Sequence, residues 1–331
     1  MPKVNISITK YSPDLRKKWD DFVETSMNGT MFHKQAFLDY HPGGKFAFNH
    51  LVFWEGDDIV AMLPAGVKSN GAILASPVGA SYGGFVIQDI SFERTLNIVD
   101  TFIDYCREQE YEKLYVIPAP AIYNKAITQH IDYALLYRKF KSDLNFISNA
   151  IEISPELDPM EYLDKTARKS VRKTLNNDDL RVVLSEDYET FYSILLENKQ
   201  KHNATPTHSL EDLKRLKELL PENLILYMAY YKEEPIAGTL LFSCNSRVIL
   251  CFYTMLKYEY EHLKPVYALN YQTMIHAKEN GYRWMDFGVS QVPSDPDPMT
   301  PALSLIKFKE RFGSKGYLRT QYVLELEKAS V

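Results

Sequence analysis

An internal repeat is the feature of this 331-residue sequence that most restricts its fold. The segment LVFWEGDDIVAMLPA (51–65) in the first half matches YMAYYKEEPIAGTLL (227–241) in the second. Each has the pattern of a strand, an acidic turn and a returning strand. Further on, YCREQEYEKLYV (105–116) matches HAKENGYRWMDF (276–287), where a helix ends and a tyrosine leads into a strand. Two matches in the same order indicate a duplicated unit.

The spacing of the two matches supports the duplication. The offset is 177 residues from Ile59 to Ile236 and 171 residues from Tyr111 to Tyr282, a difference of one short loop. A length of 331 residues also suggests two domains, at roughly 150 residues each. The sequence therefore predicts a mixed α/β fold present twice, in domains 1–150 and 151–331. The alternative is that two α/β units resemble each other by chance.

Composition excludes several classes of protein. Hydrophobic residues make up 45% and charged residues 24%, as in ordinary globular domains. A net charge of -5 does not favour a protein that coats nucleic acid. Three cysteines without a CxxC pair indicate a reducing compartment and no disulfide framework. With no apolar leader and no long apolar run, we expect a cytoplasmic protein without a transmembrane segment.

Familiar catalytic motifs are absent from the sequence. It contains no dinucleotide-binding GxGxxG after a strand, no P-loop, no HExxH and no GxSxG. No cluster of His, Cys or carboxylate residues has the spacing of metal ligands, so we expect no metal and no resident cofactor. Direct transfer between two bound substrates is a chemistry that needs neither a metal nor a covalent nucleophile.

The stretch KTARKSVRKTL (165–175) places basic residues on one face of a helix predicted over 159–175. Arginine suits phosphate because its planar fork can bind two oxygens. We therefore take Arg168, Arg172 and Lys173 as candidate phosphate-binding residues. The alternative is a basic face that is simply solvated.

Asp286 and Ser290 stand in the stretch DFGVS, at the end of a predicted strand. Ligands of α/β sheets bind near the carboxyl ends of strands. An aspartate there could orient an amine or take its proton. The alternative is an aspartate that caps the following turn.

The stretch LIKFKERFG (305–313) reads as a helix in which Lys307 and Lys309 point to different faces. Only one of them can face a site framed by Leu305 and Phe308. A lysine there could hold the oxyanion that forms when a carbonyl is attacked. The alternative is an exposed helix.

Two polar loops and one strand residue complete the candidate site. SPVGASYGG (76–84) offers Ser81, Tyr82 and Gly83, since glycines let a ligand approach the backbone. A tight turn between two strands is the alternative. His208 lies in a polar loop, where it either contacts a ligand or caps the next helix. Tyr253 lies on a predicted strand, as a ligand contact or as part of the core.

At these residues the sequence resembles the FemABX family of peptidyl or aminoacyl transferases, and the FemAB-like branch of the GNAT superfamily. Four stretches carry the resemblance in order along the chain: SPVGASYGG, KTARKSVRKTL, YALNYQTMIHAKENGYRWMDFG and LIKFKERFG. The resemblance implies two tandem GNAT-like domains, in agreement with the repeat. It also implies transfer of an aminoacyl group from a tRNA to an amine of a peptidoglycan precursor.

The resemblance also implies roles for individual residues. Lys309 matches the lysine of the family's Phe-Lys motif and would steady the tetrahedral intermediate, with Asp286 acting on the amine. Arg168 or Arg172 would hold a phosphate of a nucleotide-linked or peptide envelope precursor, or of the donor. We therefore expect an N-acyl or aminoacyl transferase of cell-envelope biogenesis.

Two departures from relatives leave the donor open between aminoacyl-tRNA and acyl-CoA. The sequence lacks the glycine-rich Arg/Gln-x-x-Gly-x-Gly/Ala loop with which GNAT enzymes bind the pyrophosphate of CoA. It also lacks a coiled-coil insertion of the kind that some Fem-type proteins carry for tRNA. One alternative is a CoA-dependent acyltransferase acting on a sugar or a polyamine. The other is an inactive GNAT-fold protein that binds a nucleotide-linked or peptide ligand.

Overall fold

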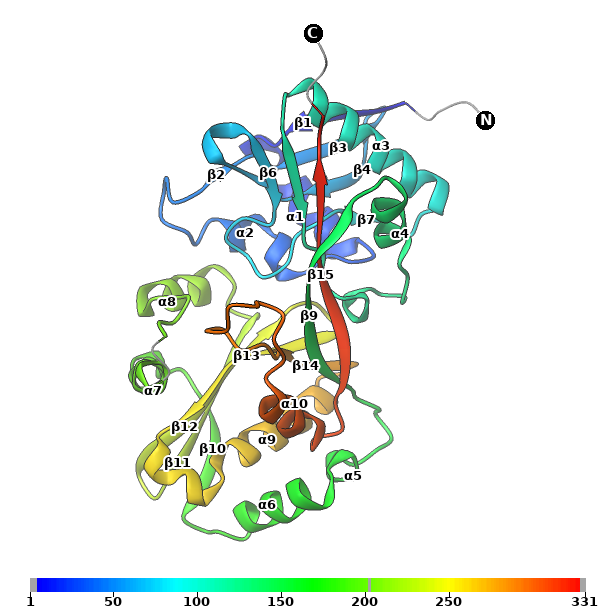
Figure 1. The fold of residues 1–331 in the computed structure, drawn as a ribbon. Coiled ribbons are helices and arrows are strands. Elements are labelled where there is room, and N and C mark those ends of the chain that lie inside the picture. The colour runs from blue at the N-terminus through cyan, green and yellow to red at the C-terminus, as the bar shows by residue number, and fades with distance from the viewer. Residues whose placement is uncertain (1–4, 202–203, 328–331) are drawn as a thin grey trace. The chain divides into compact units, whose positions relative to one another are not determined.

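The chain divides into two compact units in the computed structural model, which describes residues 5–201 and 204–327 (Figure 1). The N-terminal unit comprises Met1–Phe146 together with Leu318–Val331, and the C-terminal unit comprises Ile147–Tyr317. The closing stretch of the chain therefore belongs with the first unit. Each unit is described by itself below.

The N-terminal unit contains two groups of strands with helices between them. Its helices are α1 (Arg16–Thr25), α2 (Gln35–Leu38), α3 (Phe92–Glu108) and α4 (His130–Tyr137), with short 3-10 turns at Pro13–Leu15, Met31–His33, Ser69–Gly71 and Ala121–Tyr123. Its strands are β1 (Ile6–Lys10), β2 (Ala47–Phe48), β3 (Leu51–Glu55), β4 (Asp58–Leu63), β5 (Gly66–Lys68), β6 (Ile73–Ser76), β7 (Val86–Ile87) and β8 (Lys113–Val116).

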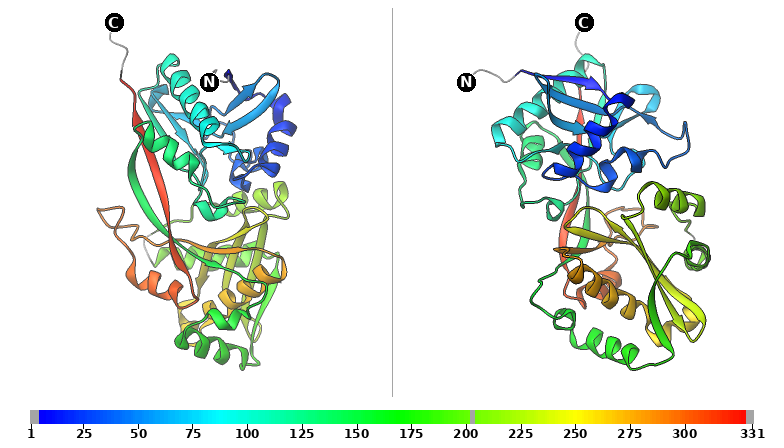
Figure 2. Two further views of the ribbon diagram at one scale, coloured as in Figure 1. Left: turned by 90° about the vertical axis from the view of Figure 1, so that its right-hand side faces the viewer. Right: turned by 180° about the vertical axis from the view of Figure 1, so that it is seen from behind.

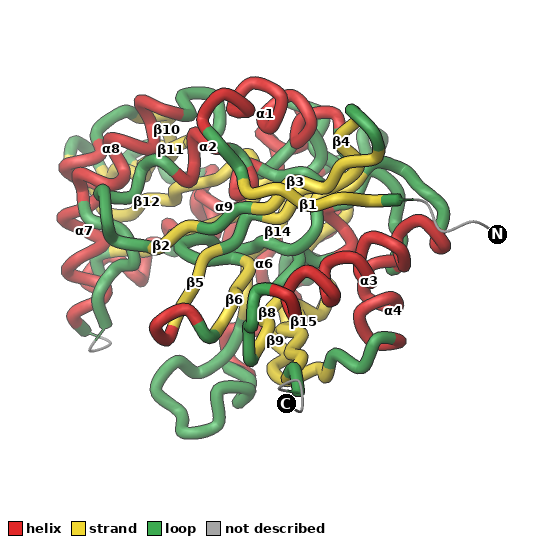
Figure 3. The backbone as a smooth tube through the Cα atoms, turned by 90° about the horizontal axis from the view of Figure 1, so that it is seen from above, coloured by secondary structure: helices red, strands yellow, loops and turns green. Residues whose placement is uncertain are grey.

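One group in this unit has the order β1-β3-β4-β7, and the other runs β2-β5-β6-β8 and continues to β15 (Lys315–Glu325) and β9 (Lys141–Glu152). Helix α3 packs along β1, as Figure 3 shows from above. Ile98, Phe102 and Cys106 on the inner face of α3 join the core with Phe53 and Leu114 of the strands.

The C-terminal unit is built on one mixed sheet with the order β10-β11-β12-β13-β14-β9. Its strands are β10 (Leu180–Ser185), β11 (Leu224–Tyr231), β12 (Glu234–Ser243), β13 (Val248–Leu256) and β14 (Trp284–Val289). Its helices are α5 (Pro159–Tyr162), α6 (Lys165–Leu175), α7 (Tyr188–Gln200), α8 (Leu210–Leu219), α9 (Pro265–Glu279) and α10 (Leu303–Glu310), with a 3-10 segment η5 at Tyr258–Leu263.

Helices cover both faces of this sheet. A Cβ atom at Gly238 of β12 would meet the ring of Phe191 on α7, whereas the next residue back, Ala237, belongs to the core formed with α9. Successive residues of a strand point to opposite faces, so α7 and α9 lie on opposite sides of the sheet. Figure 1 shows α7 and α8 on one side and α9 on the other.

The predicted duplication of a mixed α/β fold is confirmed. An antiparallel hairpin opens each repeat, β3–β4 in the first and β11–β12 in the second. A long helix follows, α3 or α9, and leads into a strand that pairs in parallel with an earlier one: β8 with β6, and β14 with β13. The helix placed between parallel strands is the crossover that such pairing requires.

Two helices differ from the prediction. The helix predicted over 159–175 is two helices, α5 and α6, because the side chain of Asp164 caps a new start by accepting a hydrogen bond from the Ala167 amide at 2.7 Å. Helix α4 was not predicted. Its outward face carries the exposed apolar residues Tyr133, Leu136 and Tyr137. The sequence therefore lacks the alternation of apolar and polar faces that indicates a surface helix.

β9 and β15 are the two longest strands among the described residues, with 12 and 11 residues. They are neighbours in the strand order and run side by side in both views of Figure 2. The chain passes from one unit to the other within each of these strands, since the units are divided at Phe146 and Leu318.

We expect Gly79→Ala to destabilise the protein more than Gly44→Ala. Both glycines have a positive φ, +73° and +79°, so the backbone strain of the two changes is similar. An added Cβ at Gly79 would lie 2.5 Å from His41 Nε2, whereas nothing lies within 4 Å at Gly44. Crowding should cost Gly79→Ala a further 1–3 kcal/mol or so of unfolding free energy, measured by urea denaturation. Equal losses would contradict the close packing of this loop.

Candidate active site

A pocket opens in the C-terminal unit where two parallel strands separate. β13 and β14 are paired at only three positions, of which the last joins Leu250 to Asp286. Beyond that point β13 continues to Leu256 along β12, while β14 continues to Val289 along β9 with a shift of register. The pocket has a volume of about 360 Å³ and is lined from α7, β13, α9, β14 and α10, among others by Asn198, Lys199, Tyr253, Asn270, Phe308 and Lys309.

A bulge in β13 shapes one wall of this pocket. Leu240 of β12 faces Tyr253 while Leu241 faces Cys251, so Phe252 is an extra residue in the ladder. Bulges bend a strand and change the direction of its side chains. The bulge lies within the stretch Cys251–Met255, all five residues of which line the pocket.

A second irregularity, in β14, is held by Asp286. The register between β14 and β9 shifts after Asp286, and Gly288 adopts a positive φ of +72°. The Asp286 carboxylate accepts hydrogen bonds from the Gly288 amide and from the Ser148 hydroxyl, both at 2.7 Å. Asp286 is fully buried and is not among the residues lining the pocket. The turn-capping alternative therefore describes its geometry, and its predicted contact with an amine remains a prediction.

Lys309 lies at the wall of the pocket with a buried ammonium group. The side chain is 5% exposed, whereas Lys307 on the neighbouring face of α10 is exposed. Its Nζ donates hydrogen bonds to the carbonyls of Gly288 at 2.8 Å and Val289 at 3.0 Å, and to the Ser290 hydroxyl at 2.8 Å. Of the two lysines in the Phe-Lys stretch, the structure directs Lys309 toward the pocket.

Burial changes the acidity of Lys309. Loss of hydration lowers the pKa of its ammonium group from the ordinary 10.5 to about 8, although the nearby Asp286 and Cys251 act in the opposite direction. Such a shift in a pocket is typical of a residue that takes part in chemistry. Burial also raises the pKa of the Cys251 thiol, which is therefore a poor nucleophile.

Phe308 and Tyr253 line the same pocket, and His208 stands behind Tyr253. The Phe308 ring packs edge-on against Tyr267 and Phe312, with ring centres 5.2 and 5.4 Å apart. The Tyr253 hydroxyl accepts a hydrogen bond from the Thr207 amide and lies 3.1 Å from Nδ1 of the buried His208. His208 therefore orients a pocket residue and does not itself line the pocket.

The basic helix lies apart from this pocket within the same unit. α6 packs against α9 through the buried Ala167 and Val171, as its predicted amphipathic pattern requires. Arg172 and Lys173 are exposed, and Arg168 donates from Nη2 to the carbonyl of Leu163 at 3.0 Å. None of these three cations lines the pocket, so their binding of phosphate remains a prediction.

The glycine-rich stretch belongs to the packed interior of the N-terminal unit. Tyr82 is buried between Phe32 and Tyr123. Gly83 forms a bridge with Pro118, and the carbonyl of Ser81 accepts a hydrogen bond from Arg319 at 2.7 Å. The tight-turn alternative accounts for these contacts, and ligand binding by Ser81, Tyr82 and Gly83 remains a prediction.

Sequence reasoning missed Asn198 and Lys199 of α7 and Asn270 of α9. Lys199 stands in the polar stretch ENKQ at the end of α7, so nothing in the sequence marks it. Asn270 carried a weak signal, since it stands within the apolar run YALNYQTM and is buried in α9. A buried amide in the middle of a helix points to a polar neighbour or a ligand.

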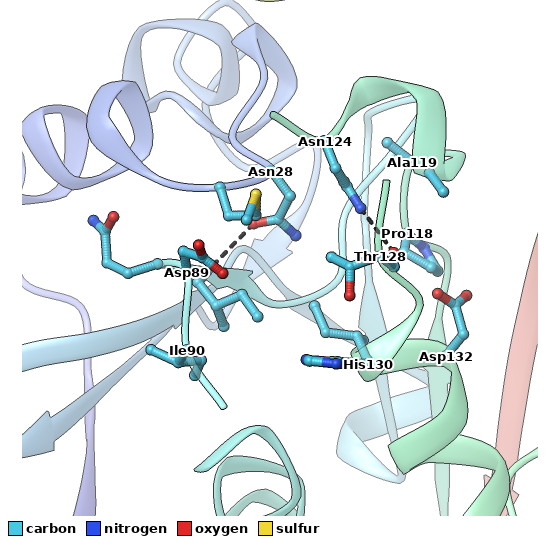
Figure 4. A pocket seen from close by; sticks show the side chains of 14 residues that line it. Asn28, Asp89, Ile90, Pro118, Ala119, Asn124, Thr128, His130 and Asp132 are labelled. Atoms are coloured by element: carbon cyan, nitrogen blue, oxygen red, sulfur yellow. Dashed lines mark hydrogen bonds between the residues drawn. The ribbon is translucent and has the colours of Figure 1, made fainter. Parts of the chain in front are cut away.

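A second pocket, in the N-terminal unit, is much smaller. Asn28, Asp89, Thr128, His130 and Asp132 lie around it in Figure 4. Its volume of about 30 Å³ holds roughly two water molecules. A substrate the size of an acyl group with its carrier does not fit there. We place the candidate active site in the C-terminal unit because the pocket there is lined by the buried Lys309.

Two further searches of the described residues bear on the class of site. Residues 5–201 and 204–327 contain no group of three or more His, Cys, Asp or Glu side chains arranged to hold a metal ion. In the same part of the chain, no helix has the length and apolar character needed to cross a membrane.

Comparisons with known proteins agree with this geometry. Residues 163–294 match the family model described as Acetyltransferase (GNAT) domain. Among solved structures, FemX superposes with a TM-score of 0.70 at 13% identity over 97% of each chain. L-PGS from Bacillus licheniformis gives 0.59 at 9% identity, covering 97% of this chain and 94% of that one.

A tandem GNAT protein from the clavulanic acid biosynthesis pathway gives a TM-score of 0.56 at 9% identity, covering 97% of this chain and 98% of that one. No curated protein matches the sequence significantly. The structural matches establish the fold, and the family match places a GNAT domain over the strands that form the pocket. The chain therefore has the tandem GNAT fold seen in FemX, and residues 163–294 match an acetyltransferase domain in sequence.

We expect Lys309→Met to remove a pH-dependent gain in stability. With a folded pKa of about 8 and an unfolded value near 10.5, the unfolded chain binds more protons between these pH values. The free energy of unfolding should therefore rise with pH there, by about 3 kcal/mol over the whole interval. Urea denaturation at several pH values from 7.5 to 10 would measure the rise, with Lys307→Met as the control. An unchanged rise in Lys309→Met would contradict the lowered pKa.

Proposed function

We propose that the C-terminal unit transfers an activated acyl or aminoacyl group to an amine in the pocket between β13 and β14. The observation that carries the proposal is the separation of these parallel strands beside the buried Lys309. After Leu250 the backbone of β13 has no strand partner on its β14 side.

The chemistry needs only the two bound substrates. The amine nitrogen bonds to the carbonyl carbon, the bond from that carbon to the carrier's oxygen or sulfur breaks, and the amine proton passes to the leaving atom. Lys309 supplies a positive charge where the oxyanion of the tetrahedral intermediate forms. We assign the nearby Asp286 to stabilising the ammonium group of Lys309. Tyr253 lines the same pocket.

The donor that these features favour is an aminoacyl-tRNA. The segment η5 between β13 and α9 carries Glu259 and Glu261, and α9 begins at Pro265, which has no amide hydrogen. Acidic side chains and a missing donor are a poor setting for the pyrophosphate of CoA. The exposed cations of α6, including Arg172 and Lys173, supply a local positive surface for nucleic acid.

The acceptor in this proposal is an amine of a nucleotide-linked or peptide envelope precursor, which the protein would meet in the cytoplasm. Its support is the FemABX-like sequence stretches together with the FemX-like fold. The second candidate is a CoA-dependent acyltransferase on a sugar or polyamine. The observation in its favour is the open β13 edge beside Lys199, which suits a long amide-bearing arm with a phosphate.

A panel of thermal shift measurements would distinguish the envelope-precursor function from the CoA-dependent one and from an inactive binding protein. It would compare CoA, acetyl-CoA and a UDP-linked muramyl peptide, each with the native protein, Arg172→Ala and Lys199→Ala. A ligand at 100 times its Kd adds about 2.7 kcal/mol of stability. A shift with the UDP-linked precursor supports the envelope acceptor. A shift with CoA and acetyl-CoA alone would replace it with the CoA-dependent reading, and binding without a product of new mass would favour the inactive alternative.

We expect Lys309→Met to lower the rate of transfer to the amine about 100-fold or more, because one stabilising group at the oxyanion is lost. Lys307→Met is the matched control, since Lys307 is exposed on the same helix. Product mass after incubation with both substrates measures the rate. Full activity in a folded Lys309→Met protein would exclude Lys309 from the reaction.

A further inference from the structure

A chain of three buried side chains leads from the pocket into the sheet. Lys309 donates to the Ser290 hydroxyl at 2.8 Å, and this hydroxyl donates to Oδ1 of Asn149 at 2.8 Å. Lys309 is 5% exposed, Ser290 is fully buried and Asn149 is 1% exposed. The chain thus joins α10, the end of β14 and β9.

The chemistry of the groups fixes the direction of these hydrogen bonds. An ammonium group only donates, so the Ser290 oxygen accepts from Lys309 and must send its own hydrogen elsewhere. The oxygen of the Asn149 amide is the acceptor for it. If the amide were turned around, its nitrogen would face Ser290, and the hydroxyl hydrogen would lose this acceptor.

The burial of Asn149 lowers the stability of the protein. Its Nδ2 is buried and has no hydrogen-bond partner among the described residues. An unsatisfied buried donor lowers stability, whereas a leucine of similar size would not. We therefore attribute the role of Asn149 to its amide oxygen, which accepts the hydrogen bond from Ser290.

The three acceptors around Lys309 differ in mobility. The carbonyls of Gly288 and Val289 belong to the backbone of the bulged strand and cannot turn away alone. A hydroxyl rotates about a single bond. The bond from the Ser290 hydroxyl to Asn149 limits this rotation and so fixes the direction in which Ser290 accepts from Lys309.

We propose that Ser290 and Asn149 are positioning residues that fix the direction of the Lys309 ammonium group at the wall of the pocket, where it would meet the oxyanion. This inference rests on the proposed function, in which Lys309 acts on that oxyanion. The other groups that act on the charge of Lys309 are Asp286 of β14 and Cys251 of β13, and both stay unchanged in the test.

Competitive labelling with isotopic acetic anhydride measures the titration of Lys309 without any substrate. The reaction is run from pH 6 to 10 and read by mass spectrometry, with the exposed Lys307 as an internal reference. Asn149→Asp brings a carboxylate behind Ser290 and should raise the titration midpoint of Lys309 by about one pH unit. Ser290→Ala removes an acceptor for the charged form and should lower it. Ser243→Ala, which removes the acceptor of the Tyr282 hydroxyl, is the matched control.

Transfer assays supply the second readout. Ser290→Ala should lower kcat about tenfold and leave KM unchanged, because the group acts only as the intermediate forms. Labelling midpoints in Asn149→Asp and Ser290→Ala that equal the midpoint in Ser243→Ala would overturn the inference. If Asn149→Asp does not melt cooperatively, Ser290→Ala decides alone. Shifted midpoints combined with full transfer by Lys309→Met would instead overturn the proposed function of Lys309.

Discussion

The separation of β13 from β14 after their third paired position is the constraint on which the rest of the candidate site depends. β13 keeps its antiparallel pairing with β12, with a bulge at Phe252 within the stretch Cys251–Met255 that lines the pocket. β14 stays paired with β9, and the buried Asp286 accepts hydrogen bonds from Ser148 of β9 and from the Gly288 amide of β14. Because a sheet that stayed paired along its length would leave no space between its strands, the pocket exists only through this divergence.

The candidate site also depends on the buried charge of Lys309, which the surrounding groups stabilise. Removing an ammonium group from water is costly unless hydrogen bonds and an opposite charge replace the lost hydration. Here two backbone carbonyls, one hydroxyl and the neighbouring Asp286 do so. The ring of Phe308 packs against Tyr267 and Phe312 and fixes the turn of α10 that carries Lys309. The same burial that lowers the pKa of Lys309 strengthens its field within the pocket.

Several sequence motifs have local structural explanations. The cations of α6 follow from an amphipathic helix whose apolar side packs on α9, and Arg168 is held by the carbonyl of Leu163. The glycines near Tyr82 allow a tight path among aromatic rings of the N-terminal unit. Periodicity and turn composition report such local requirements well, but they do not show whether a side chain also faces a ligand.

The sequence by itself determined the repeated α/β pattern, most of the helices and strands, and the separation of Lys307 and Lys309 onto different faces of one helix, because these properties depend on neighbours within a few residues. Only the tertiary structure decided that Asp286 lies behind the pocket, that Asn198 and Asn270 line it, and that Ser290 meets Asn149, 141 residues away in the chain. Strand register, bulges and the loss of hydration arise from contacts between distant segments. No local pattern carries that information, so the geometry and acidity of the site come from the fold.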